Sequence, residues 1–463
     1  SGCKSQIPYI RSSALVEAKS KRHLVLQDCL HVPAMVRRVA IMDRALALAL
    51  WIAVFVAAPS AMVDAVTLDP TQAAVLKDSA WGKTFDGWTD ANPDCSTTAG
   101  VTCDDTGMIT KLEIAYTRIS GSIPSSISAL RKLQVLRLPS AELTGSIPDG
   151  ITLLTDLTHL NLASNQLNGS IPEELGALSN LRTMYFLNNN LAGPIPSTIG
   201  SLQYLNYLNL YKNQLSGSIP STIGLLTGLT TIELSYNKLT GSIPPTITSL
   251  TTLYNLILPS LPLLSSPVLC AWYLAGNQLT GSFDAFTGYG SYVREIDLSS
   301  NLLSGSIPAS LSDLYRLEIL DLSSNQFDGS IPASISEINS LTTLSLSNNQ
   351  FIDSIPSTID SLTELCTLKL ASNQLSGSIP SEMSSLQKLT YLDLRLNQLT
   401  GSFPESLSAL TALQELWLDG NKLTQTLPSA IGNLVELRNL SLSNNNLFGR
   451  IPDTVTLLTN LKN

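Results

Sequence analysis

A single 24-residue period runs from about residue 111 to the end of the chain and constrains the fold more than any other feature. The pattern Leu-x-Leu-x-x-Asn-x-Leu-x-Gly-x-Ile-Pro recurs in one frame, with its asparagine at positions 165, 189, 213, 237, 277, 301, 325, 349, 373, 397, 421 and 445. Every step is 24 residues except the step from 237 to 277, and two earlier copies carry Thr117 and Ala141 in the asparagine position. Fourteen copies in register do not arise by chance, so the chain is predicted to be a repeat array.

The residue types within one repeat predict how each coil of the array is built. Alternate side chains of a strand face opposite sides, so Leu160 and Leu162 are expected to point inward. After the strand the chain turns, and the carboxamide of Asn165 can both donate to and accept from the main chain of that turn, so stacked asparagines should form a ladder. Gly169 suits a positive φ, and Pro172 fixes φ where no donor is needed.

Composition supports an ordered array and excludes one class of partner. The chain is 44% hydrophobic and 14% charged, which is too apolar for a disordered protein. One repeat cannot offset its own backbone entropy, so stability must come from contacts between neighbouring coils. The net charge of −9 leaves no surplus of Lys and Arg to neutralise phosphates, so nucleic acid is excluded as a partner. No cofactor and no metal site are predicted.

The first 65 residues match no repeat and have the features of targeting sequence. Residues 35–65 combine a basic start, an apolar run and a small-residue site, which is the pattern of a cleaved secretory signal peptide; an uncleaved anchor is the alternative. Residues 1–34 precede that signal and are interpreted as a leader that the mature protein lacks. If they are instead a transit peptide, the destination would be the thylakoid lumen, whereas a signal peptide predicts secretion or display at the cell surface.

Two cysteines lie just ahead of the repeats. Cys95 and Cys103 are eight residues apart, which predicts a local disulfide formed in an oxidising compartment; two free thiols are the alternative. A zinc site is disfavoured because no second Cys or His pair lies nearby.

These residues resemble the plant-type leucine-rich-repeat family of receptor-like kinases, receptor-like proteins and polygalacturonase-inhibiting proteins. The Gly-x-Ile-Pro element, as in Gly305-Ser-Ile307-Pro308, is typical of that subclass, and Trp88 with the Cys pair resembles its N-terminal cap. The resemblance implies an α/β solenoid, a right-handed superhelix with a parallel sheet on its concave face. It also implies short strands and 3₁₀ turns on the convex face and a small helical cap over residues 66–110, followed by about 14 repeats over 111–463.

The long step and the C-terminus depart from the repeat pattern. Deleting residues 257–272 restores the frame, so this apolar, Pro-rich stretch is predicted to be a 16-residue insertion, either a gene-model error or a real loop that bulges from the array. The sequence stops at Asn463 inside a repeat, which is interpreted as truncation. Attachment to a membrane through a missing C-terminal segment stays open.

Outward-facing strand positions supply the candidate ligand residues. One group is aromatic and mildly acidic: Tyr185, Tyr207, Tyr211, Glu233 and Tyr236. Others are the neighbouring Asp297 and Asp321, and a group near the end that comprises Asp393, Arg395 and Trp417. Exposed aromatic side chains recur at interfaces, although Tyr is also a common strand residue and Asp in this position also serves solubility.

Catalysis is not predicted. His159 has no acid and nucleophile at motif spacing, and flat strand faces give no water-excluding site. Asn168 and Asn439 begin glycosylation tripeptides. We therefore expect an extracellular binding scaffold for a protein, a peptide, a cell-wall glycan or a co-receptor, as in a receptor-like protein or kinase. The alternatives are a secreted inhibitor of a polysaccharide hydrolase and a structural wall component.

Overall fold

The computed structural model describes residues 68–81, 95, 99–116, 118–250, 270–283 and 293–462. The predicted leader 1–34, the signal peptide 35–65, Trp88 and Thr117 lie outside these residues. So does most of the expected insertion.

Every repeat forms one coil, and the coils stack so that each contributes a strand to one long sheet. Within the described residues this sheet holds fifteen strands, in which β1 and β2 pair antiparallel and all later neighbours pair parallel. The strands in spatial order are β1 (Val101–Cys103), β2 (Ile109–Glu113), β3 (Val135–Arg137), β4 (His159–Asn161), β5 (Thr183–Tyr185), β7 (Tyr207–Asn209), β9 (Thr231–Glu233), β11 (Cys270–Tyr273), β13 (Val293–Asp297), β15 (Ile319–Asp321), β17 (Thr343–Ser345), β18 (Thr367–Lys369), β19 (Tyr391–Asp393), β20 (Glu415–Trp417) and β21 (Asn439–Ser441).

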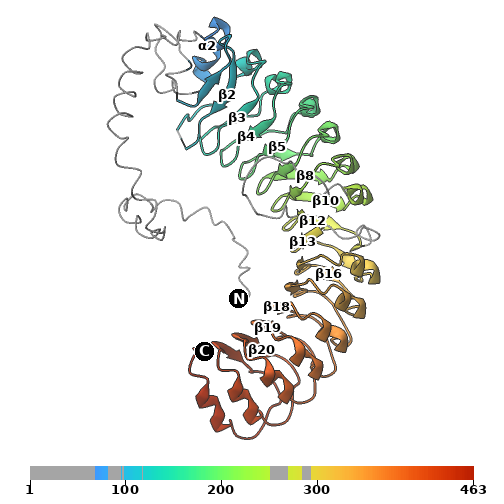
Figure 1. Cartoon of the computed structure of the whole chain (residues 1–463). Coiled ribbons are helices and arrows are strands. Elements are labelled where there is room, and N and C mark those ends of the chain that lie inside the picture. Colours follow the sequence, from blue (N-terminus) through green and yellow to red (C-terminus); the bar gives the residue numbers. More distant parts are fainter. Residues whose placement is uncertain are drawn as a thin grey trace, which may run out of the picture. The chain divides into compact units, whose positions relative to one another are not determined.

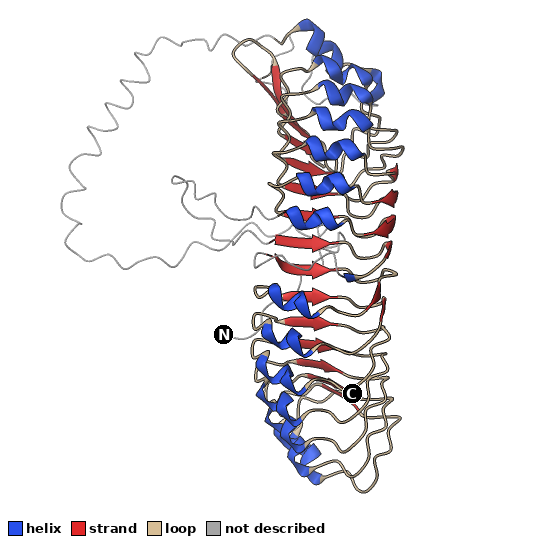
Figure 2. Ribbon diagram, turned by 90° about the vertical axis from the view of Figure 1, so that its right-hand side faces the viewer, coloured by secondary structure: helices blue, strands red, loops and turns tan. Residues whose placement is uncertain are grey.

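The opposite side of most described coils carries a 3₁₀ helix, and some of the coils add a short strand. In residues 66–463, Figure 1 shows the long sheet on the inner side of a curved stack and the helical turns on the outer side, and Figure 2 shows the strands in one ladder. The 3₁₀ helices are η2 (Ser125–Ala129), η3 (Asp149–Leu153), η4 (Glu173–Ala177), η5 (Ser197–Ser201), η6 (Ser221–Leu225), η7 (Pro245–Ser249), η9 (Ala309–Asp313), η10 (Ala333–Glu337), η11 (Ser357–Ser361), η12 (Ser381–Ser385), η13 (Glu405–Ala409), η14 (Ser429–Asn433) and η15 (Asp453–Leu457). The short strands are β6 (Ala192–Gly193), β8 (Gln214–Ser218), β10 (Lys238–Ser242), β12 (Gln278–Thr280), β14 (Ser304–Gly305) and β16 (Gln326–Phe327). The predicted solenoid, with its concave parallel sheet, is confirmed.

The inward leucines and the asparagine ladder are as the repeat pattern predicts. Leu160 and Leu162 are fully buried. The side-chain nitrogen of Asn165 donates to the carbonyls of Leu138 (2.8 Å) and Leu162 (2.9 Å), and its oxygen accepts from the backbone N–H of Leu143 at 3.0 Å. One carboxamide thus serves main-chain groups of two adjacent coils, and the same contacts recur from coil to coil.

An N-terminal cap closes the first coil. It contains the helix α2 (Pro70–Leu76) and the 3₁₀ turn η1 (Ser79–Trp81), and the fully buried Trp81 donates its indole N–H to the carbonyl of Val75 at 2.9 Å. The buried Gln72 accepts from the backbone N–H of Ile109 at 2.6 Å, which joins α2 to β2. A disulfide joins Cys95 to Cys103, the pair for which a local bridge was predicted.

The structure places the end of the inserted segment earlier than the sequence pattern does. Trp272, assigned to the insertion 257–272, pairs with Ile232 on one side and Ile296 on the other and is 7% exposed. Trp272 and Ala271 are therefore part of strand β11, and that part of the prediction is wrong. Leu256 and Trp272 are both large and apolar, so the repeat pattern alone does not decide which of them fills the buried position.

Among the described residues, no helix is both long enough and apolar enough to span a bilayer.

Candidate functional site

On the concave face, the last residues of six adjacent strands form a row that consists mainly of tyrosines and carboxylates. Register pairing runs from Tyr185 through Asn209, Glu233, Tyr273 and Asp297 to Asp321, on strands β5 to β15. We call Tyr185, Glu233, Tyr273, Asp297 and Asp321 the tyrosine–acid row. Because neighbouring strands lie about 4.8 Å apart, the row is about 24 Å long.

The other predicted tyrosines flank this row. Tyr207 begins β7 and is 37% exposed. Tyr211 and Tyr236 lie beyond the strands, two and three residues after β7 and β9, and not within them. Their rings meet edge to face with centroids 5.3 Å apart. The structure therefore brings all five residues of the first predicted group onto adjacent coils, and joins them to Asp297 and Asp321.

Tyr273 is the member of the row that sequence reasoning missed. It lies between Glu233 and Asp297, and its hydroxyl donates to the carboxylate of Glu295. Burial raises the pKa of Tyr273 above its usual value, and the hydrogen bond to Glu295 adds to this effect. The signal was present, since removing the extra residues puts Tyr273 in the same repeat position as Glu233.

The carboxylates of Glu233 and Asp297 in the row are largely buried and therefore poorly solvated. Burial raises the pKa of Glu233 to about 7, although a hydrogen bond from the backbone N–H of Ser235 (3.0 Å) opposes the change. Burial also raises the pKa of Asp297, and the neighbouring Asp321 raises it further. Within the described residues, no cation is paired with Glu233, Asp297 or Asp321. The row is thus a surface on which a cationic group would relieve unfavourable charge.

The third predicted group is separate and internally paired. Asp393, Arg395 and Trp417 are called the Asp393–Trp417 cluster. Asp393 ends β19, Arg395 follows two residues later, and Trp417 ends β20; β17 and β18 lie between these strands and the row. Arg395 forms a 2.8 Å ion pair with Asp393 and lies 5.1 Å above the ring of Trp417. Burial raises the pKa of Asp393, whose bonds to the backbone N–H and guanidinium of Arg395 oppose that shift.

The remaining site predictions fall in different environments. Asn168 is exposed, whereas the side-chain nitrogen of Asn439 donates to both oxygens of Glu415 at 2.7 and 2.8 Å. Glycosylation at Asn439 would break those bonds; both sites stay predictions. Burial lowers the pKa of His159, whose Nδ1 lies 2.8 Å from the hydroxyl of Thr158. No group of three or more His, Cys, Asp or Glu in the described part of the chain could hold a metal ion.

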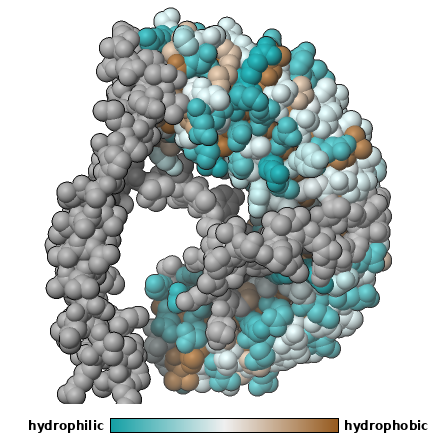
Figure 3. Space-filling model, turned by 45° about the horizontal axis from the view of Figure 1, so that its top comes forward, coloured by the Kyte–Doolittle hydropathy of each residue, from teal (hydrophilic) through white to brown (hydrophobic). Residues whose placement is uncertain are grey.

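The wider surface is mostly polar. On the face drawn in Figure 3, the coloured part of the molecule is largely hydrophilic, with hydrophobic residues in small, scattered patches. Ligand recognition on the coloured part of that face would depend on specific polar side chains, because it shows no broad apolar patch.

Comparison with known proteins gives family and structural matches. Models described as leucine rich repeat match residues 273–327, 291–351, 339–399 and 388–447, and also 156–178, 204–226 and 228–250. No curated protein sequence matches the chain.

Three solved structures are similar to most of the chain. The crystal structure of a TDR receptor is 29% identical with a TM-score of 0.65, covering 74% of this chain and 57% of that one. The plant peptide hormone receptor RGFR1 in complex with RGF2 is 30% identical (TM-score 0.52; 74% and 64% covered). The Arabidopsis receptor kinase HAESA, in complex with the peptide hormone IDA and the co-receptor SERK1, is 31% identical (TM-score 0.50; 74% and 63% covered). The chain thus spans less than two thirds of each of these structures.

Proposed function

Because this chain belongs to the plant-type leucine-rich-repeat family, we propose that it is an extracellular recognition scaffold, the ectodomain of a receptor-like protein or kinase, that binds an extended peptide on its concave face. The tyrosine–acid row is the observation that carries this proposal. Similar structures in complex with a peptide hormone support the peptide class, and the Cys95–Cys103 disulfide supports an oxidising compartment.

The row suits a peptide that carries a basic side chain. Its length of about 24 Å matches roughly seven extended residues. Glu233, Asp297 and Asp321 gain a counter-charge when Lys or Arg binds, and the flanking tyrosines offer contact area with little loss of side-chain entropy. The residues of the row stand on paired strands, and Tyr211 and Tyr236 follow two of these strands directly, so little reorganisation is needed on binding.

Selection from a random library tests the proposal. Phage-displayed octapeptides would be selected on the full chain, and enriched peptides are expected to contain Lys or Arg and to bind at least about tenfold more weakly to a Tyr185→Ala/Tyr211→Ala/Tyr236→Ala variant. The matched control is Tyr204→Ala/Tyr315→Ala, because these tyrosines are 63% and 53% exposed but lie between a 3₁₀ helix and the next strand. No enrichment, or equal loss in both variants, would contradict the proposal.

A further inference from the structure

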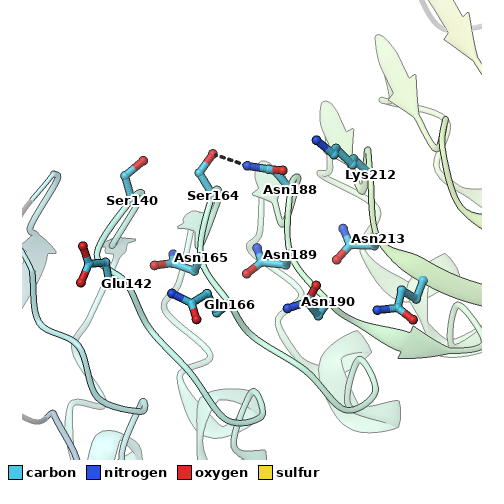
Figure 4. A pocket seen from close by; sticks show the side chains of 11 residues that line it. Ser140, Glu142, Ser164, Asn165, Gln166, Asn188, Asn189, Asn190, Lys212 and Asn213 are labelled. Atoms are coloured by element: carbon cyan, nitrogen blue, oxygen red, sulfur yellow. Dashed lines mark hydrogen bonds between the residues drawn. The ribbon is translucent and has the colours of Figure 1, made fainter. Parts of the chain in front are cut away.

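A second candidate surface lies beside the concave face, where each strand ends and the chain turns. There the coils over residues 140–214 form a groove of about 590 Å³, which we call the lateral groove (Figure 4). Apart from Glu142 and Lys212, every residue that lines it is Ser, Asn or Gln. No predicted ligand residue lines the groove.

The side chains at the floor of the groove are already hydrogen-bonded to the main chain, whereas the side chains of its two walls are accessible. The floor consists of Asn165, Asn189 and Asn213, whose carboxamides are occupied in the ladder. One wall presents Gln166, Asn190 and Gln214, which follow one another at equivalent positions of adjacent coils and are exposed. In the described part of the chain, the side chains of Gln166 and Asn190 make no hydrogen bond, so their donors and acceptors face solvent.

The opposite wall presents hydroxyl and amide groups from the turn residues. Ser164 and Asn188 occupy it, with the amide of Asn188 donating to the hydroxyl of Ser164 at 3.4 Å (Figure 4). Formal charge lies at the two ends only. Glu142, at one end, is already paired with Arg118 at 2.9 Å, and Lys212 lies at the other. The middle of the groove is neutral.

In the coil that follows Lys212, the equivalent turn residue of this wall is aromatic. Tyr236 has the same turn position one coil further on, with φ 57°, and is 45% exposed. Its ring lies over Gly276 of the next coil, where an added Cβ would come within 3.0 Å of its Cδ1 atom. Glycine is not needed there for its φ of 64°, because Ser164 and Lys212 adopt the same left-handed conformation with side chains. Gly276 therefore makes room for the ring of Tyr236.

A similar arrangement occurs at another turn. Leu396 is 55% exposed at the turn position and lies over Gly420, where an added Cβ would be 2.7 Å from its Cδ2 atom. Coils are about 4.8 Å apart, so a bulky side chain that lies over the next turn, as Tyr236 and Leu396 do, leaves no space there for a Cβ. Tyr236 is thus an exposed ring held in a fixed place at the end of the lateral groove.

We propose that the lateral groove, with Tyr236 at its end, binds a neutral, linear oligosaccharide lying along the stacking direction. Carboxamides both donate and accept, as vicinal sugar hydroxyls do, and they repeat at about 4.8 Å, close to the length of one sugar unit. The face of Tyr236 can pack against the C–H face of a terminal ring. A peptide fits less well, because the lining offers no apolar place for side chains, and a polyanion meets a chain of net charge −9.

Calorimetric titration of the full chain with neutral hexaoses tests this inference. Cellohexaose, laminarihexaose and maltohexaose would be compared with a capped hexaalanine peptide. At least one hexaose is expected to bind, and Gln166→Ala/Asn190→Ala/Gln214→Ala should weaken its binding by about tenfold or more. The matched control is Gln326→Ala/Gln350→Ala/Gln374→Ala, which removes exposed glutamines from the same position of coils outside the groove. Thermal unfolding establishes that each variant is folded.

A pair of glycine variants tests the position of the ring. Gly276→Ala is expected to displace Tyr236 and to weaken hexaose binding by several fold, whereas Gly420→Ala displaces Leu396 and should leave binding unchanged. The inference is overturned if no hexaose binds at millimolar concentration, if hexaalanine binds more tightly, or if the two triple variants lose affinity equally. Because the glutamine wall lies off the tyrosine–acid row, loss of peptide binding and loss of sugar binding can be told apart.

Discussion

The tyrosine–acid row and the Asp393–Trp417 cluster occupy the same concave sheet but differ in how their charge is balanced. In the cluster, Arg395 is paired with Asp393 and covers Trp417. In the row, Glu233, Asp297 and Asp321 have, among the described residues, only backbone and hydroxyl donors of their own turns. Burial raises the pKa of Glu233 and Asp297, as it does that of Asp393, but no cation opposes the shift in the row. The same strand geometry thus carries one group whose carboxylate is paired with a cation of the chain and one whose carboxylates can take their counter-charge from a partner.

The largest expected effect is a pH dependence of stability that originates in the row. The folded pKa of Glu233, about 7, lies above its ordinary 4.5, so the folded state binds the extra proton and stability falls as pH rises from about 4.5 through 7. The shift corresponds to up to about 3 kcal/mol. Glu233→Gln should flatten this part of the curve of unfolding free energy against pH, measured with urea. An unchanged slope would contradict the assigned burial.

Loss of one ladder asparagine should lower the free energy of unfolding by the same amount in both regions, because the ladder makes the same main-chain hydrogen bonds in each. Asn277→Ala below the row and Asn397→Ala below the cluster each leave main-chain groups unsatisfied and should cost about 2 kcal/mol of unfolding free energy. Denaturant unfolding of the two variants measures this. A difference larger than about 1 kcal/mol would show that the coils are not equivalent supports.

Removing one carboxylate charge should be less favourable in the cluster than in the row. Burial raises the pKa of Asp393 as it does that of Asp297, but Asp393→Asn also removes the partner of Arg395, which should cost up to about 1 kcal/mol relative to Asp297→Asn at pH 8. Asp297→Asn removes a buried charge next to Asp321 and should be neutral or stabilising at the same pH. Thermal unfolding at pH 8 measures this difference, and equal effects of the two changes would remove the contrast between the groups.

The smallest effect concerns the contact between Arg395 and Trp417. Trp417→Leu keeps an apolar side chain but removes the ring that Arg395 covers, and should lower stability by about 0.5–1 kcal/mol. Arg395→Met in the Trp417→Leu background provides the double-mutant cycle. A coupling energy near zero would mean that the guanidinium and the ring are merely close.

The 24-residue period was sufficient to predict the sheet, the inward leucines and the ladder, because each is fixed by residues within one repeat. The end of the insertion was not predictable, because Leu256 and Trp272 are equally suited to the buried position of β11. Tyr273 was missed although its position was predictable, because it lies four residues before Asn277 as Glu233 lies before Asn237. The fit of Tyr236 against Gly276 depends on the separation of two coils, a quantity that no single repeat contains.

Parts of the candidate site were predictable and parts were not. Membership of adjacent strands followed from the period, so Tyr185 could be grouped with Glu233, and Asp297 with Asp321, although the two groups were not predicted to form one row. Burial and pairing could not be read from the period, since Asp297 and Asp393 have the same repeat position but, within the described residues, only Asp393 has a cation as partner. That partner, Arg395, belongs to the same repeat, so charge pairing depends on residues that the repeat pattern does not specify.

Strand β11 regains its place beside β9 even though 40 residues, and not 24, separate their equivalent positions. The ladder bond from Leu239 to Asn277 and the pairing of β10 with β12 are likewise kept. A coil boundary that accepts extra chain while these pairings are kept, with a register irregularity only between Cys270 and Ala271, is a natural insertion point. A foreign loop, an epitope or a small folded module could be grafted there while the array on both sides keeps its own register.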